Sequence, residues 1–256
     1  MMMWVQAGLW GFLGGSALIL GALIAWVAPL PQRAIAAVMA IGSGVLISAV
    51  AFDLMDEAFK QGGFVATAAG FLGGGVAYTA ANVIVSRRGA RHRKRSGQES
   101  SPDQPSADHP DATNTGLAIA IGALLDGIPE SVVIGVSLLA GSGVNAVTVA
   151  AVFLSNVPEG LSSAAGMKKA GRSARYVFGV WTGIAVASGV AAALGNLFLA
   201  GAAPGVIACV TAVAAGAILA MLVDTMIPEA TEATHDYSGL IAVVGFLLAF
   251  VLTKLD

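Results

Sequence analysis

Long apolar segments recur along this chain, and short polar segments separate them. Each apolar segment has about 20 residues, which is the length that an α-helix needs to cross the hydrocarbon core of a bilayer. The pattern predicts an all-α polytopic membrane protein, with eight transmembrane helices that form one domain over residues 1–256. The predicted spans are residues 7–30, 34–58, 64–85, 116–140, 144–167, 175–200, 204–228 and 238–253.

The composition fits this pattern and argues against a soluble fold. Hydrophobic residues make up 57% of the chain and charged residues only 11%, whereas a soluble domain is about a quarter charged. A soluble helical bundle would also need polar outer faces, which most of the predicted spans lack. The chain has 33 glycines, and glycine suits close helix packing in lipid.

The cysteine content argues against disulfide bonds, and the N-terminal segment argues against a signal peptide. Cys209 is the single cysteine and lies inside an apolar segment, so we expect no disulfide framework and interpret Cys209 as a small core residue. The first 30 residues have no basic segment, and their apolar run is too long for a signal peptide. We therefore expect them to remain as the first membrane span.

The basic residues are distributed unevenly between the two predicted sides of the membrane. Of the 13 Lys and Arg residues, only Lys60 and Lys254 fall on the side that holds both termini. Loops rich in Lys and Arg remain in the cytoplasm, so we expect both termini to face outward. The residues on the predicted cytoplasmic side are Arg33, Arg87, Arg88, Arg91, Arg93, Lys94, Arg95, Lys168, Lys169, Arg172 and Arg175.

The segment 87–115 is the one long hydrophilic stretch of the chain. It begins with basic residues and continues rich in Ser, Pro and Asp. A segment of this composition cannot bury a core, so we predict a flexible cytoplasmic loop. His92 and His109 lie in it, too far apart in sequence to indicate a metal site by themselves.

Three acidic residues fall near the middle of a predicted span, namely Asp126, Glu130 and Glu159. A carboxylate at the centre of a bilayer costs about 3 kcal/mol even on mild insertion scales. Apart from Arg175, the first residue of the sixth predicted span, no Lys, Arg or His lies inside any predicted span, so no basic side chain near the middle of a span can pair with them. The partners of these acids must therefore be protons, polar groups or a bound cation.

The fourth predicted span carries the motif DGIPES, residues 126–131. Asp126 and Glu130 are four residues apart and share one face of a helix. Pro129 has no N–H and clashes with the carbonyl of Leu125, so it frees that oxygen and bends the helix. Divalent cations of the hard and borderline classes bind oxygen ligands of this kind.

The fifth predicted span carries a matching motif, SNVPEG, at residues 155–160. Ser155 and Glu159 are four residues apart, Asn156 adds an amide, and Pro158 frees the carbonyl of Leu154. The two spans run antiparallel and both motifs fall near the midplane, so they can face each other. Together they predict a cation site from Asp126, Glu130, Ser155, Asn156 and Glu159.

Further acidic residues lie near the ends of the second and seventh spans. The sequences LMDEA (54–58) and MIPEA (226–230) look like copies of one element in opposite orientations. This predicts an inverted repeat, in which spans 1–3 match spans 6–8 around the central pair 4 and 5. Acids at the two mouths would attract a cation and pass it on, although ordinary helix-end residues are an alternative interpretation. The predicted entrance holds Asp53, Asp56 and Glu57, and the predicted exit holds Asp224, Glu229 and His235.

The two proline–glutamate motifs, the eight spans and the long loop after the third span resemble the ZIP (Zrt/Irt-like) metal transporters. In that family the fourth span typically has His-Asn-x-Pro-Glu-Gly, and the fifth has His-(Asp/Glu/Asn)-x-Pro-Glu. The resemblance implies that Asp126 occupies the position where the family usually has a histidine ligand, and that Glu130 matches the glutamate shared by the family. Gly127 replaces the usual asparagine ligand and offers no side chain.

In the fifth span the resemblance implies the same kind of departure. Ser155 replaces the usual histidine, Asn156 keeps an oxygen ligand, and Glu159 matches the glutamate that bridges two metal positions in the family. The ligand set therefore contains oxygen atoms only. Oxygen ligands suit Mn²⁺, Mg²⁺ and Ca²⁺ better than histidine does, although zinc also binds carboxylates.

We therefore expect a divalent metal transporter that carries zinc or a broader set such as Mn, Fe, Cd and Mg into the cytoplasm. The metal would be a substrate, and we expect no cofactor, no enzymatic activity and no nucleic-acid partner. The family implies a homodimer, and a bacterial inner membrane is the expected location. One alternative is a proton-coupled cation exporter, and another is a ZIP-like protein that binds metal without transporting it. A membrane-embedded hydrolase is disfavoured because no Ser–His pair lies at depth.

Overall fold

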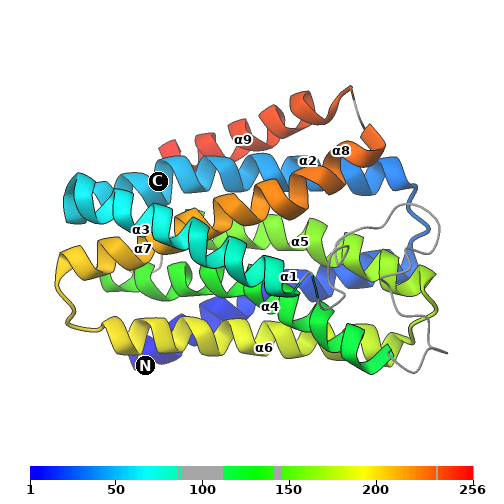
Figure 1. Cartoon of the computed structure of the whole chain (residues 1–256), viewed down its shortest axis with the longest axis horizontal. Coiled ribbons are helices and arrows are strands. Elements are labelled where there is room, and N and C mark those ends of the chain that lie inside the picture. The colour runs from blue at the N-terminus through cyan, green and yellow to red at the C-terminus, as the bar shows by residue number, and fades with distance from the viewer. Residues whose placement is uncertain (86, 88–111, 141–145, 235, 256) are drawn as a thin grey trace.

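The computed structural model describes residues 1–85, 87, 112–140, 146–234 and 236–255. These residues form helices and connecting turns, with no strand among them, and the helices run roughly along the long axis of the molecule (Figure 1). Four described segments are long and apolar enough to cross a membrane. They are Met3–Val27, Gln32–Val85, Ala174–Leu199 and Pro204–Glu232, and Ser238–Lys254 is a shorter apolar helix. The prediction of an all-helical protein with long apolar helices is confirmed.

The helices follow one another with few connecting residues. Two of them, α2 and α7, continue directly into a π-helical turn (η1 and η4) and then into the next α-helix. The elements are α1 (Met3–Val27), α2 (Gln32–Ala49), η1 (Val50–Leu54), α3 (Met55–Val85), α4 (Ala112–Ser137), the 3₁₀ turn η3 (Leu138–Ala140), α5 (Ala146–Lys169), α6 (Ala174–Leu199), α7 (Pro204–Met221), η4 (Leu222–Met226), α8 (Ile227–Thr234) and α9 (Ser238–Leu255). Most of the predicted loop 87–115, and His235, lie outside the described residues.

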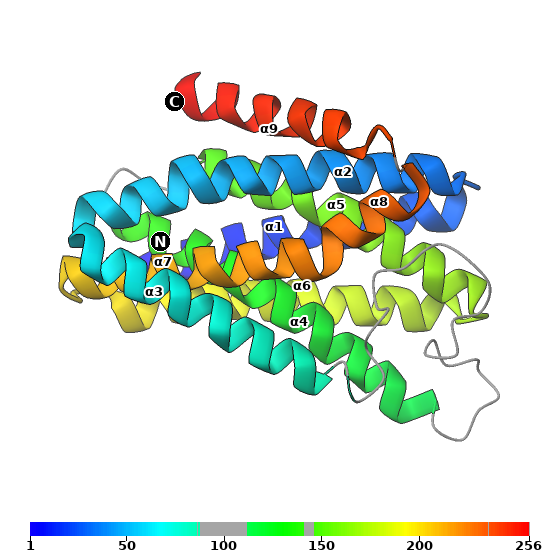
Figure 2. The ribbon, with the colours of Figure 1, turned by 45° about the horizontal axis from the view of Figure 1, so that its top comes forward.

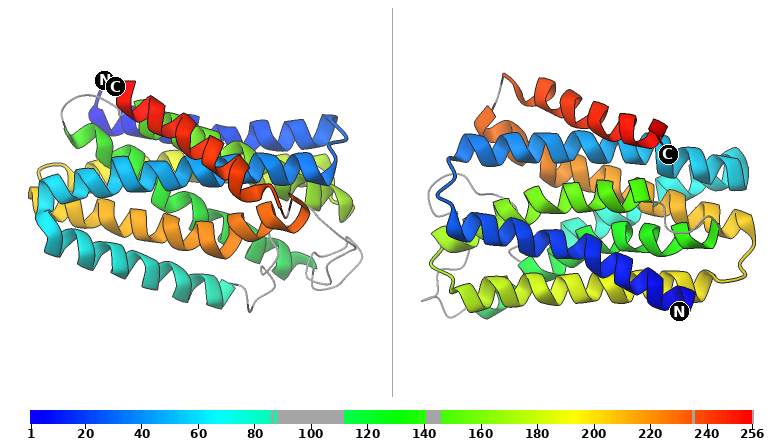
Figure 3. Two further views of the ribbon diagram at one scale, coloured as in Figure 1. Left: turned by 90° about the horizontal axis from the view of Figure 1, so that it is seen from above. Right: turned by 180° about the vertical axis from the view of Figure 1, so that it is seen from behind.

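The continuous run from α2 to α3 reverses direction at Gly63. This residue has φ 68° and ψ −177° inside the run, a backbone conformation that glycine adopts at little cost. The rest of α3 then returns along α7 (Figure 2). Both termini of the chain lie at the same end of the molecule as this turn (Figures 1 and 3).

The helices pack in two groups. In the first, which we call the α1 bundle, α1 packs against α5 and α6, and α4 packs against α6. In the second, the α2 bundle, α3 packs against α7, and α2 packs against α8 and α9. The two bundles meet where α2 contacts α5 and where α4 contacts α3 and α7. We call this contact surface the seam.

The outer faces of the helices are apolar, as lipid contact requires. Phe64, Val65, Leu72 and Phe198 are each at least 69% exposed. Exposed large apolar side chains also occur on α1, α7 and α9, whereas monomeric soluble proteins rarely expose large apolar patches. The arrangement therefore agrees with integration in a membrane and not with a soluble helical bundle.

The lengths of α2 and η1 are repeated by α7 and η4 later in the chain. α2 and α7 each have 18 residues, and η1 and η4 each have five. Residue numbers in the second pair exceed those in the first by 172, from the helix starts (32 and 204) to the ends of the π-turns (54 and 226). The same shift relates Glu57 to Glu229, so these two residues hold equivalent positions after the two π-turns.

Glycines allow the helices of the α2 bundle to approach closely. A Cβ atom placed on Gly74 of α3 would lie 1.9 Å from the carbonyl oxygen of Val213, and one on Gly216 of α7 would lie 1.9 Å from that of Phe71. Each helix therefore presents a glycine to the backbone of the other. Small residues in this arrangement are a common way to pack helices in lipid.

α2 and α9 meet in the same reciprocal way. A Cβ on Gly44 would lie 1.9 Å from the carbonyl oxygen of Ala242, and one on Gly245 would lie 2.1 Å from that of Ile41. Gly44 and Gly216 differ by the same 172 positions. On the partner helices, the numbers 74 and 245 differ by 171, which aligns α3 with α9.

Alanine at Gly74 is expected to destabilise the folded protein by about 1–3 kcal/mol, because its methyl group would overlap the backbone of α7. Gly73, the neighbouring residue, has open space where a methyl group would lie, with nothing within 4 Å, so Gly73→Ala is the matched control. We expect Gly74→Ala to lower the thermal unfolding midpoint in detergent and Gly73→Ala to leave it unchanged or raise it slightly. Equal shifts in both variants would contradict the close approach of α3 and α7.

Candidate metal site

The polar residues of the motif DGIPES lie in the interior of the protein, in the C-terminal half of α4. Asp126 and Glu130 are each 1% exposed, and Pro129 lies inside the helix. α4 contains no Lys, Arg or His, so neither carboxylate meets a basic residue of its own helix. The two acids are buried in the seam region, where α4 contacts α3 and α7.

Asp126 accepts a hydrogen bond from a residue that the sequence analysis did not identify. The Tyr78 hydroxyl of α3 donates to Asp126 Oδ1 over 2.6 Å. Tyr78 is 2% exposed, and a buried tyrosine hydroxyl generally requires an acceptor. A tyrosine inside an apolar span was therefore a usable signal, but its partner lies 48 positions away and depends on how the helices cross.

The motif SNVPEG lies in α5 and is equally buried. Ser155, Asn156 and Glu159 are 1%, 4% and 4% exposed. The Ser155 hydroxyl donates to the carbonyl of Val152 over 2.9 Å, and Asn156 Nδ2 donates to the carbonyl of Gly14 over 3.1 Å. The Ser155 O–H and the Asn156 N–H are used as hydrogen-bond donors. The side-chain oxygen atoms of both residues can therefore accept a hydrogen bond or coordinate a cation.

The backbone around Pro158 is held closely by α1. A Cβ on Gly21 would lie 2.1 Å from the carbonyl oxygen of Val157, and one on Gly160 would lie 2.1 Å from that of Leu18. Interfaces this close leave little freedom for α5 to slide along α1. The α1 bundle therefore holds the Ser155–Glu159 segment in a defined position.

The described residues contain no group of three or more His, Cys, Asp or Glu side chains that could hold a metal ion. α4 and α5 contact each other, but the carboxylates of the two motifs do not form a three-acid cluster in this structure. A site from these residues would thus use at most two of the acids together with hydroxyl, amide or carbonyl oxygens, or would need the helices to move.

η1 and the start of α3, which carry the predicted entrance residues, lie at the end of the molecule that holds the termini (Figure 3). Asp53 is half-buried in η1, whereas Asp56 and Glu57 are exposed at the start of α3. Asp56 forms an ion pair of 2.7 Å with Lys60 and raises the pKa of that lysine, mainly through the hydrogen bond. Glu57 accepts a hydrogen bond from Gln61. Lys60 thus offsets part of the negative charge expected at this mouth.

The predicted exit residues are placed at different depths. Asp224 is exposed in η4 and accepts a hydrogen bond from Asn82 Nδ2 over 3.2 Å. Glu229 is only 1% exposed and accepts one from the Ser162 hydroxyl over 2.7 Å. Glu229 is therefore an interior residue in this structure and not a surface residue of a mouth.

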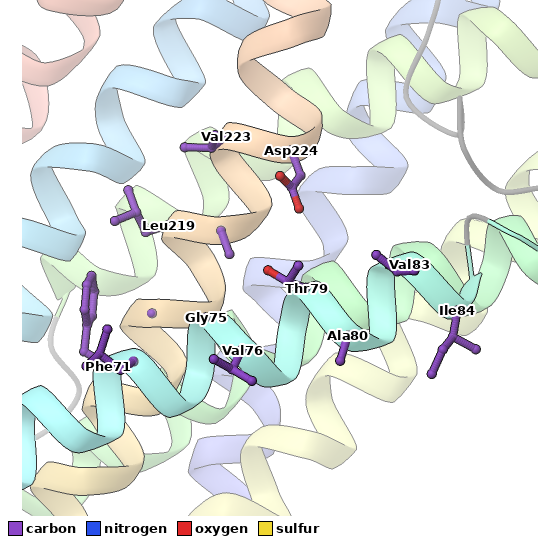
Figure 4. Close-up of a pocket in the computed structure, with 13 residues that line it drawn as sticks. Phe71, Gly75, Val76, Thr79, Ala80, Val83, Ile84, Leu219, Val223 and Asp224 are labelled. Atoms are coloured by element: carbon purple, nitrogen blue, oxygen red, sulfur yellow. The ribbon is translucent and has the colours of Figure 1, made fainter.

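An open groove of about 890 Å³ runs between α3 and α7 (Figure 4). Its lining includes the apolar side chains of Phe71, Val76 and Leu219, with Thr79 and Asp224 as its polar members. None of the five predicted metal ligands lines it. Its apolar surface fits lipid chains and not a cation.

Comparison with known proteins gives no assignment. No family model matches the sequence, and no curated protein matches it. The ZIP resemblance therefore rests on the motifs of the chain itself.

Proposed function

We propose that this chain is a ZIP-like transporter that moves divalent metal cations into the cytoplasm. The observation that carries the proposal is the burial of Asp126, Glu130 and Glu159 in apolar helices, each at most 4% exposed. α4 has no basic residue, and those of α5 lie in its last turn. A transported cation is a physical reason for keeping such acids at this depth.

The proposal includes eight membrane spans arranged as an inverted repeat of three, two and three helices. The break at Gly63 divides the long run into two antiparallel spans, which supports the count. The constant shift of 172 between the two π-turn segments supports the repeat. The reciprocal glycine contacts of α3 with α7 and of α2 with α9 support it as well.

We infer that both termini face the outside. The start of α2, the end of α5 and the start of α6 lie at the opposite end of the molecule from the termini (Figure 1). These helix ends carry Arg33, Lys168 and Arg175, and basic residues favour the cytoplasmic side. Lys168 also lies 5.3 Å from the ring centre of Trp26, a pairing suited to the membrane interface. A bacterial inner membrane and a homodimer complete the proposal by family resemblance only.

The oxygen-only ligand set suggests a broader metal selectivity than in histidine-bearing relatives. Carboxylates from Asp126, Glu130 and Glu159, with Ser155 and Asn156, suit Mn²⁺ or Mg²⁺ as well as zinc. We propose that a cation enters past Asp53, Asp56 and Glu57 and leaves past Asp224 and Glu229. Exposing the site to each side in turn requires the two bundles to move along the seam.

Uptake by purified protein in sealed liposomes tests the proposal. Zn²⁺, Mn²⁺, Fe²⁺, Cd²⁺ and Mg²⁺ should be offered outside in turn, and their internal concentrations followed against protein-free liposomes. We expect accumulation of at least one of these ions. Accumulation that requires an imposed proton gradient and follows the opposite direction would favour an exporter, and binding without flux would favour a non-transporting metal protein.

A further inference from the structure

Two buried hydrogen bonds between side chains cross the seam. Tyr78 of α3 donates to Asp126 of α4 over 2.6 Å, and Ser162 of α5 donates to Glu229 of α8 over 2.7 Å. All four side chains are at most 2% exposed. Each bond joins the α2 bundle to the α1 bundle through a hydroxyl and a carboxyl group where water does not compete, so each is stronger than on a surface.

Both bonds lie on the same side of the two helix prolines, Pro129 of α4 and Pro158 of α5. Asp126 precedes Pro129 on α4, and Ser162 follows Pro158 on α5. Because α4 and α5 run in opposite directions (Figure 1), both residues lie toward the end at which α5 terminates in its two lysines. This is the side that we propose to be cytoplasmic.

The equivalent position on the other side lacks the second bond. Glu57 is equivalent to Glu229, but it is exposed and accepts a hydrogen bond from Gln61 within its own helix. Aligning Pro129 with Pro158 makes Val133 the equivalent of Ser162. Valine has no hydroxyl and cannot donate to Glu57.

The equivalent of the first bond is missing for the same chemical reason. The shift of 171 between α3 and α9 makes Ala249 the equivalent of Tyr78, and Ala249 is 3% exposed at a comparable depth. The alignment of Pro129 with Pro158 makes Ser155 the equivalent of Asp126. The Ser155 hydroxyl donates to the carbonyl of Val152 within α5. Among the described residues at these equivalent positions, the repeat therefore brings similar backbone together on both sides, but side-chain donors join the bundles only at Tyr78–Asp126 and Ser162–Glu229.

We propose that Tyr78 and Ser162 form a latch that keeps the cytoplasmic side of the seam closed, and that a cation on Asp126 weakens it. The second part of this inference, the effect of a cation on Asp126, rests on the proposed function. A cation that approaches Asp126 repels the phenol proton and competes for the oxygen that accepts it. Loading of the site would therefore loosen the Tyr78 bond and favour opening toward the cytoplasm. Tyr78 and Ser162 are positioning residues in this scheme and need not contact the metal.

A pair of cysteine reporters at equivalent sites tests the latch. Ala230 and Ala58 differ by 172 positions, and they are 2% and 0% exposed. Ala230→Cys reports the cytoplasmic side and Ala58→Cys the other, each in a Cys209→Ser background. The rate of labelling by a soluble maleimide is measured in the full-length protein in detergent.

Loss of both hydroxyls, in Tyr78→Phe with Ser162→Ala, is expected to raise the labelling rate at position 230 by about tenfold or more, because two hydrogen bonds are lost. Labelling at position 58 should fall or stay unchanged. Tyr176→Phe and Ser43→Ala are matched controls, because Ser43 donates within its own helix and Tyr176 lies away from the seam on α6. Each single variant should give a smaller increase, and either one suffices if the other does not fold.

Addition of Mn²⁺ or Zn²⁺ separates the latch from the proposed function. If both hold, metal accelerates labelling at position 230 in the parent and has little further effect in Tyr78→Phe. If the latch exists but the chain binds no metal, the variants still open position 230 and metal changes nothing. If the variants label like the parent, or if positions 58 and 230 change together, the latch is overturned.

Discussion

Replacing Glu130 and Glu159 together with glutamine is expected to abolish metal uptake. Glutamine keeps the size of each side chain but removes two negative charges from the proposed site. Loss of an outer-shell partner alone costs about 10- to 100-fold in metal affinity, and two lost ligands should cost more. Uptake of the preferred ion into liposomes and equilibrium metal binding in detergent are the two measurements.

The fold should tolerate this change, which separates loss of function from loss of structure. Both residues are nearly fully buried, and burial of charge is costly, so neutral side chains should not lower the thermal unfolding midpoint. Glu232→Gln, a partly exposed residue of α8 with no proposed role, is the matched control and should transport like the parent. Parent-like uptake by the double variant would refute the site assignment.

The sequence predicted the helical class and the burial of DGIPES and SNVPEG because both follow from local pattern. A carboxylate inside about 20 apolar residues has to be buried wherever its helix packs. The π-turns η1 and η4 could not be predicted in the same way. Only Pro228, just after η4, marks a disturbed helix, and η1 has no proline within or directly after it.

The hydrogen-bond partners of the buried acids could not be predicted from the sequence, because they depend on how the helices cross. Tyr78 meets Asp126, and Ser162 meets Glu229, between helices that are distant in the chain. The contrast between Glu57 and Glu229 shows the difficulty most clearly. The two lie in similar local sequences, yet Glu57 is exposed and Glu229 is 1% exposed. Glu229 packs inside the protein, where it accepts a hydrogen bond from Ser162 across the seam.

The residue at position 126 is expected to set the metal preference, so Asp126→His should shift selectivity toward zinc. Imidazole favours zinc and the later transition metals, whereas a carboxylate suits Mn²⁺ and Mg²⁺. We expect the ratio of zinc to manganese uptake to rise by at least about tenfold, the scale on which ligand shells change metal affinity. Competition between the two ions in the same liposome preparation gives this ratio directly.

Two further variants decide whether the effect arises from coordination or from the lost bond to Tyr78. Ser155→His adds an imidazole to the other helix and leaves the Tyr78–Asp126 bond intact, so it should also favour zinc. Tyr78→Phe removes the bond and adds no ligand, so it should leave the zinc-to-manganese ratio unchanged. If Tyr78→Phe alone reproduces the shift, the hydrogen bond and not the ligand type controls selectivity. If Asp126→His leaves the ratio unchanged, position 126 does not contact the transported ion.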